Sequence, residues 1–192
     1  MARLENSQAL GAVRSSEWLR NIALVVGASL LVALCARITV PLPFTPVPLT
    51  MQNMGVLLVG MLLGSRRGFA ALVLYVVEGA SGMPVFNPTG PGGIAQILGA
   101  TGGFLLAYPF VAFVGGRVME RGKTTFFRAL SAACAGELVL FLGGLGWLAI
   151  LTHSLGQAFR FGLYWFVFAE VIKIMLATGL SQRLRRSFRV QG

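Results

Sequence analysis

Six apolar segments follow one another along the chain, and they constrain the fold more than any other feature of the sequence. They cover residues 21–38, 49–64, 68–78, 94–116, 129–152 and 160–181. Only 11% of the 192 residues are charged, whereas soluble domains are about 25% charged. Because a helix needs roughly 20 apolar residues to cross a bilayer, the pattern predicts an all-α integral membrane protein with six transmembrane helices. The second and third segments are short, so we expect short or tilted helices there.

The basic residues indicate how these helices are oriented. Thirteen of the sixteen lysines and arginines precede the first segment, follow the last, or lie between segments two and three or four and five. By the positive-inside rule, both termini are then cytoplasmic. We therefore expect one six-helix domain over residues 1–192 in a prokaryotic-type cell membrane, with a polar N-terminal segment at 1–20 and a basic tail at 182–192.

Composition excludes several other classes of function. The net charge of +10 comes from short basic clusters between apolar runs, which is not the pattern of a nucleic-acid-binding surface. One histidine, two cysteines inside apolar segments (Cys35 and Cys134) and no aspartate predict neither a metal site nor a disulfide framework. The stretch GRVMERGKT at 116–124 is not a P-loop, because five residues rather than four separate its glycines. Any ATP-driven step therefore needs a partner chain.

The stretch FAEVIKIML at 168–176 places Glu170 and Lys173 in the middle of the last apolar segment. Residues three apart share one face of a helix. Each such charge costs about 2.5–3.5 kcal/mol at the centre of a membrane helix, and an i,i+3 pair in water returns only about 0.2–0.5 kcal/mol. Two interpretations remain, a helix-packing ion pair or an acceptor and a donor for a polar ligand. Glu137 in the fifth segment is a third ionisable group and a candidate partner of Lys173.

Two further patterns allow a ligand site or ordinary membrane packing. Four aromatic residues just before Glu170 form either one wall of a ligand pocket or an interfacial belt: Tyr164, Trp165, Phe166 and Phe168. The outer connections 39–48 and 79–93 are rich in proline and glycine. They are either simple turns or irregular backbone that lines a cavity, because polar backbone cannot face lipid.

Four motifs, in order along nearly the whole chain, resemble the BioY family of biotin-specific capture subunits of energy-coupling factor (ECF) vitamin importers. They are TPVPLTMQ at 45–52, GMPVFNPTGPGG at 82–93, ATGGFLLAY at 100–108 and ExxK at 170–173. The resemblance implies six helices with both termini inside and a biotin pocket near the outer face. It also implies partners, namely a transmembrane coupling subunit and two ATPase subunits.

The resemblance also implies roles for particular residues. Gln52 would border the pocket, Phe86 and Asn87 would close over it, and Thr101, Gly102 and Gly103 would bring backbone close to biotin. Glu170 and Lys173 would bind its polar groups. Tyr164 is a candidate biotin-binding residue from the aromatic stretch alone and not from the resemblance. In the first segment, Ala23 with Gly27 and Ser29 with Ala33 are small-xxx-small pairs, which permit close helix approach. They are expected to pack internally or to meet the coupling subunit.

These observations predict a high-affinity biotin-binding membrane subunit that captures vitamin outside for ATP-driven uptake, without a cofactor and without enzymatic activity. One alternative is a transporter of another vitamin or small carboxylate, acting alone or as an oligomer. Another is an intramembrane hydrolase that uses Ser131 or Ser154 with His153, although Ser154 and His153 are sequence neighbours and do not face each other on a helix. A scaffold protein would leave Glu170 and Lys173 unexplained.

Overall fold

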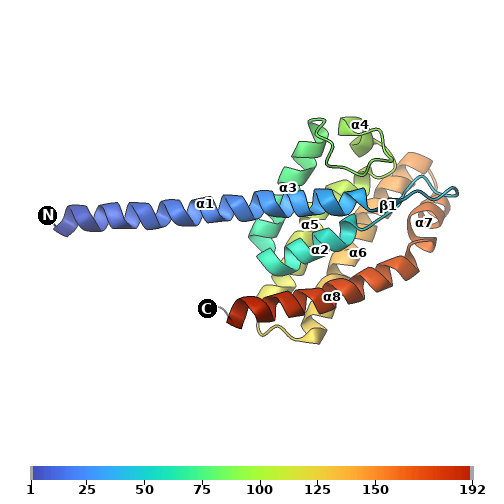
Figure 1. Ribbon diagram of the computed structural model, residues 1–192. Coiled ribbons are helices and arrows are strands. Elements are labelled where there is room, and N and C mark those ends of the chain that lie inside the picture. The colour runs from blue at the N-terminus through green and yellow to red at the C-terminus, as the bar shows by residue number, and fades with distance from the viewer. Residues whose placement is uncertain (1, 191–192) are drawn as a thin grey trace.

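The computed structural model describes residues 2–190, and the side chains of residues 17–185 (Figure 1). The side chains of residues 1–16, in the predicted polar segment, and of residues 186–192, in the predicted basic tail, are therefore not described. They include those of Arg3, Arg14, Arg186 and Arg189. A two-stranded antiparallel hairpin, in which Thr39 pairs with Thr50, interrupts a succession of helices. The elements are α1 (Ala2–Arg37), β1 (Thr39–Val40), β2 (Leu49–Thr50), α2 (Gln52–Leu63), α3 (Ser65–Ala80), α4 (Gly93–Leu98), α5 (Gly102–Glu120), α6 (Phe126–Thr152), α7 (Leu155–Phe159), the π-helical turn η1 (Arg160–Tyr164) and α8 (Val167–Val190).

The predicted all-α fold is confirmed, and α1, α2, α3, α5, α6 and α8 correspond in order to the six apolar segments. By length and hydropathy, three stretches of the described chain could span a membrane: Glu17–Arg37 of α1, α5 and α6. A fourth is the pair Leu155–Tyr164 and Val167–Arg185, which is bent by 48°. Helix α2 is apolar but short, as expected.

Two apolar segments are not continuous helices. The segment 94–116 is broken between α4 and α5, where the Gly99 carbonyl accepts a hydrogen bond of 2.9 Å from the Trp147 indole of α6. The segment 160–181 begins with the π-helical turn and becomes α-helical only from Val167. Both breaks lie beside the cavity described below, where backbone that is not helical can be covered by protein rather than by lipid.

Helix α2 lies at the centre of the bundle and packs against α1, α3, α5, α6 and α8. Nine of its twelve residues are buried. Close approach depends on Gly60, where an added Cβ would lie 2.5 Å from the Ala112 carbonyl oxygen of α5. This central position explains why α2 can be shorter than a membrane span and why its polar first turn reaches the interior.

The two ends of the bundle differ in charge and in structure. At one end, Arg185 of α8 donates to the Met61 carbonyl at 2.9 Å, and Glu120 of α5 accepts from the Ser65 backbone at 2.7 Å. We call this end the basic end, because arginines flank these contacts: Arg66, Arg67, Arg117 and Arg121. Figure 1 shows α1 starting and α8 ending on this side, with the hairpin and α7 on the opposite side, the loop end.

Candidate ligand-binding site

A cavity lies beneath the loop end, between the β1–β2 hairpin, the connection after α3, and helices α2, α5, α6 and α8. Its wall is apolar over one part and polar over another. The apolar part consists of Val47, Pro48, Phe104, Leu105, Leu140, Phe141, Gly162 and Phe166. The polar part consists of Thr50, Gln52, Asn53, Asn87, Thr101, Tyr108, Glu170 and Lys173. A mostly apolar cavity with a few convergent polar groups is typical of a small-molecule site.

The predicted pair of Glu170 and Lys173 forms a buried ion pair in this wall. Lys173 Nζ donates to Glu170 Oε1 at 2.7 Å, and the two residues are 4% and 7% exposed. Their spacing of three residues places both on the face of α8 that meets α2. The pair uses only one of the three protons on the lysine ammonium, so Lys173 keeps further donor capacity.

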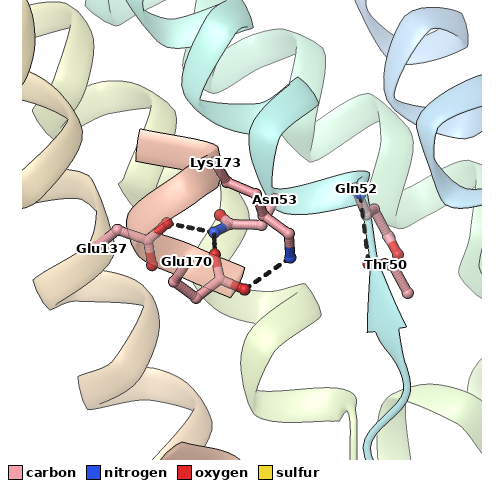
Figure 2. Close-up of polar contacts among 6 residues, drawn as sticks. All are labelled: Thr50, Gln52, Asn53, Glu137, Glu170 and Lys173. Carbon is pink, nitrogen blue, oxygen red and sulfur yellow. Dashed lines mark hydrogen bonds and ion pairs between the residues drawn. The ribbon is translucent and has the colours of Figure 1, made fainter. Parts of the chain in front are cut away.

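Asn53, on the first turn of α2, joins this pair to the third buried acid. Its Nδ2 donates to Glu170 Oε2 at 2.7 Å and also to Glu137 Oε1 of α6, and both bonds are drawn in Figure 2. Among the described residues, the hydrogen-bond partner of Glu137 is Asn53 and not Lys173, the candidate that the sequence had suggested. We call Asn53, Glu137, Glu170 and Lys173 the central cluster. Three helices far apart in the sequence meet there.

A second set of hydrogen bonds connects the cavity wall to the loop after α3. Gln52 Nε2 donates to the Tyr75 hydroxyl at 2.6 Å, and that hydroxyl donates to the Val85 carbonyl at 3.0 Å. Phe86 then packs edge-on against Tyr75, with 5.5 Å between ring centroids. The loop 81–92 is thereby held over α3 and next to Gln52.

The structure brings five of the nine predicted biotin-binding residues to the cavity: Gln52, Asn87, Thr101, Glu170 and Lys173. Asn87 is oriented by Thr89, whose hydroxyl donates to its Oδ1 at 2.7 Å. These residues come from all four motifs that suggested the family, with Thr101 supplied by the ATGG motif.

The other four predicted residues lie outside the cavity wall. Phe86 is 3% exposed and fills the space over Gly79 and Tyr75. Gly102 and Gly103 allow contacts within the bundle, since a Cβ on Gly103 would lie 2.2 Å from Trp147 Cβ of α6. Tyr164 is 69% exposed and packs edge-on against Trp165, with 4.9 Å between ring centroids.

The four residues predicted to meet a partner divide into two kinds. Ala23 and Gly27 are exposed, and a Cβ on Gly27 would meet no atom within 4 Å. Ser29 is fully buried and donates a hydrogen bond to the Glu78 carboxylate of α3, while Ala33 packs against the core. Only Ala23 and Gly27 are therefore open to another chain.

Among the polar residues of the cavity wall, sequence reasoning missed Thr50, Asn53 and Tyr108. A signal for Asn53 was available, because Gln52 and Asn53 are two adjacent polar residues inside an apolar segment. Polar residues in membrane segments usually face the interior of a bundle and mark functional positions. Tyr108 carried no such signal.

The fold and the cavity define a class: a helical membrane protein with a small-molecule site near one end of its bundle. The model of the BioY family matches residues 6–190, and the chain belongs to that family. This confirms the resemblance inferred from the four motifs.

Relatives and a solved structure agree with this assignment. The chain is 36% identical to "Probable biotin transporter BioY" of Pyrococcus horikoshii over 166 residues, which cover 86% of this chain and 96% of the relative. It is 34% identical to "Biotin transporter BioY" of Thermotoga maritima over 147 residues, 77% of this chain and 86% of the relative. A crystal structure of the S-component for biotin from an ECF-type ABC transporter has the same fold, with a TM-score of 0.80 at 24% identity over 89% of this chain and 93% of the other. Membership of a transporter family confirms the prediction that the chain is not an enzyme.

Proposed function

We propose that this chain is the biotin-capturing membrane subunit of an ATP-driven vitamin importer. The observation that carries the proposal is the buried Glu170–Lys173 ion pair in the wall of a cavity at the loop end. Relatives at 34–36% identity are named as biotin transporters, which supports biotin as the ligand. In this proposal residues 1–192 act as one six-helix domain, and biotin is cargo, so that no cofactor is needed.

The chemistry of biotin fits the two parts of the cavity wall. Its ureido group both donates and accepts hydrogen bonds, which suits the Glu170 carboxylate and the remaining protons of Lys173. Its thioether ring and alkyl chain suit the apolar part, where Phe104, Phe141 and Phe166 supply flat surface. Hydrogen bonds to the ligand then offset the free-energy cost of burying the two charges. In a purely structural pair this cost would remain.

The proposed orientation follows from the two ends of the bundle. With the basic end in the cytoplasm, as the positive-inside rule favours, the cavity lies in the outer half of the bundle. The transmembrane coupling subunit and two ATPase subunits of an ECF module would supply the ATP-driven step. The coupling subunit would meet the exposed Ala23 and Gly27 on α1.

Calorimetric titration of biotin into the purified chain in detergent, without ATP, tests the proposal. We expect binding at one site and an affinity at least tenfold lower in Glu170→Gln, since this change weakens the charge-assisted hydrogen bonds of Glu170. Glu120→Gln at the basic end is the matched control and should bind as the parent does. A folded parent chain that binds no biotin would refute the proposal.

A further inference from the structure

Two buried oxygen atoms of the central cluster receive no hydrogen bond from any described residue: Asn53 Oδ1 and Glu137 Oε2. Both residues are 4% exposed. A buried acceptor without a donor is costly, so it is expected to find a partner in the working molecule. Asn53 is itself part of the cavity wall, whereas Glu137 is not.

The neighbours of Asn53 determine which way its amide faces. An amide NH₂ has two protons, and the carboxylates of Glu137 and Glu170 each accept one hydrogen bond from it (Figure 2). The reverse orientation would place the amide oxygen against these carboxylate oxygens, which is repulsive. Both protons are therefore committed to the two acids, and the amide oxygen can act only as an acceptor.

We propose that Asn53 determines ligand specificity by accepting a hydrogen bond from an N–H group of the ligand, and that Glu137 is a positioning residue that holds the Asn53 amide in that orientation. This inference rests on the proposed biotin site and assigns part of its selectivity. Because Asn53 belongs to the cavity wall and its Oδ1 has no donor among the described residues, a molecule seated in the cavity is the candidate donor.

The cluster then requires a ligand that carries donor and acceptor groups close together. Asn53 Oδ1 needs a donor, and Lys173 Nζ, two of whose protons are not used by Glu170, needs an acceptor. A cyclic urea presents N–H groups on both sides of one carbonyl and meets both requirements. An ester, a lactone or a simple carboxylate has no N–H and leaves Asn53 unpaired.

Ligand analogues test the role of Asn53. Biotin and its two singly N-methylated ureido analogues are titrated into the full chain, because methylation removes one N–H donor at a time. We expect the parent chain to bind at least one analogue about 10- to 100-fold more weakly than biotin, the usual effect of leaving a buried acceptor unpaired. If the parent binds both analogues as tightly as biotin, the proposal is wrong, and this result needs no variant.

The variant Asn53→Ala completes the comparison. We expect it to bind biotin more weakly and to lose most of its discrimination against the methylated analogue, to within about threefold, because the acceptor is gone. Asn53→Leu, of similar volume, runs in parallel in case the alanine variant does not fold. Glu120→Gln, at the basic end and outside the cavity wall, should keep the discrimination. A variant that binds all ligands more weakly by the same factor would assign Asn53 a packing role and overturn the proposal.

Two substitutions separate positioning by Glu137 from a structural role. Glu137→Gln keeps an oxygen that can accept from Asn53 Nδ2, so we expect the discrimination between biotin and the methylated analogue to be retained. Glu137→Leu frees the amide to rotate, and the discrimination should fall about tenfold. Loss of thermal stability with unchanged discrimination would refute the positioning role. Failure of the parent chain to bind biotin at all would instead refute the proposed function.

Discussion

The central cluster and the polar contacts of the basic end are built from similar side chains but are satisfied to different degrees. At the basic end, both oxygens of Glu120 accept from Ser65, and Arg185 donates twice to the Met61 carbonyl. These groups complete the ends of α2 and α3, where helices leave backbone groups unpaired. In the central cluster, two acceptors and part of the lysine ammonium have no partner among the described residues.

This difference separates polar groups that hold the fold from polar groups that are kept for a ligand. A contact that serves only stability is expected to saturate its donors and acceptors. The side chains of the central cluster are more buried than those of Glu120 and Arg185, and yet they are less saturated than these two contacts. We conclude that substitutions in the cluster should change ligand binding most, and that substitutions at the basic end should change stability alone.

The largest effect is expected for Lys173→Met. This change removes the only cation of the cluster and leaves Glu170 as a buried charge without its partner, and breaking such a pair costs about 3–5 kcal/mol. We expect biotin affinity to fall by a factor of about 100 or more, together with a lower unfolding temperature. Calorimetry and thermal unfolding measure both quantities. Lys123→Met, at an exposed position between α5 and α6, is the control, and equal affinities for the two variants would contradict a role for the cluster in binding.

A smaller effect is expected for Tyr75→Phe. The ring stays packed against Phe86, but the hydroxyl that accepts from Gln52 and donates to the Val85 carbonyl is lost. Two hydrogen bonds of about 0.5–1.5 kcal/mol each correspond to a roughly tenfold lower affinity. Because these bonds hold the loop 81–92, the change should appear mainly as faster dissociation of radiolabelled biotin.

The hydroxyl of Tyr164 provides the matched control for this variant. Tyr164 lies outside the cavity wall, although the sequence suggested it as part of an aromatic wall for the ligand. Tyr164→Phe should therefore leave the dissociation rate within twofold of the parent value. An equal acceleration in both variants would show that the hydroxyl of Tyr75 has no particular connection with the site.

The sequence predicted those features that depend on local spacing. Hydropathy identified the order of the helices, and the separation of three residues placed Glu170 and Lys173 together. The hydrogen-bond partner of Glu137 was harder to predict, because this partner, Asn53, lies 84 residues away in the chain. A single sequence contains no information about which of several buried polar groups will meet across helices.

The roles of glycines and the places where helices break were also difficult to predict from the sequence. Gly102 and Gly103 suggested close approach of backbone to a ligand, but the same lack of a side chain serves close approach of α5 to Trp147. The bend of 48° before α8 was also hidden, because the hydropathy of the segment is continuous across it. Tyr164 lies in the π-helical turn before this bend and is exposed, whereas Phe166 lies in the cavity wall.

At the basic end, Glu120→Ala should affect stability without affecting the ligand. It removes the carboxylate that accepts from the Ser65 backbone at the first residue of α3, and losing such a cap costs about 0.5–2 kcal/mol. We expect a lower unfolding temperature by circular dichroism in detergent and a biotin affinity within twofold of the parent value. A tenfold loss of affinity would mean that the two ends are energetically coupled, and the division drawn here would not hold.

The smallest effect on the isolated chain is expected for Gly27→Leu. Space around Gly27 is open, so the larger side chain should change neither the unfolding temperature nor biotin affinity. If this face of α1 meets the coupling subunit, however, the leucine would prevent close helix approach and reduce biotin uptake by cells that produce the complete importer. Gly179→Leu, at an equally open glycine on α8, is the control and should leave uptake unchanged. Equal uptake by both variants would exclude Gly27 from the interface. If only Gly27→Leu reduces biotin uptake, Gly27 is a third kind of position, which contributes neither to stability nor to ligand binding but to contact with the partner.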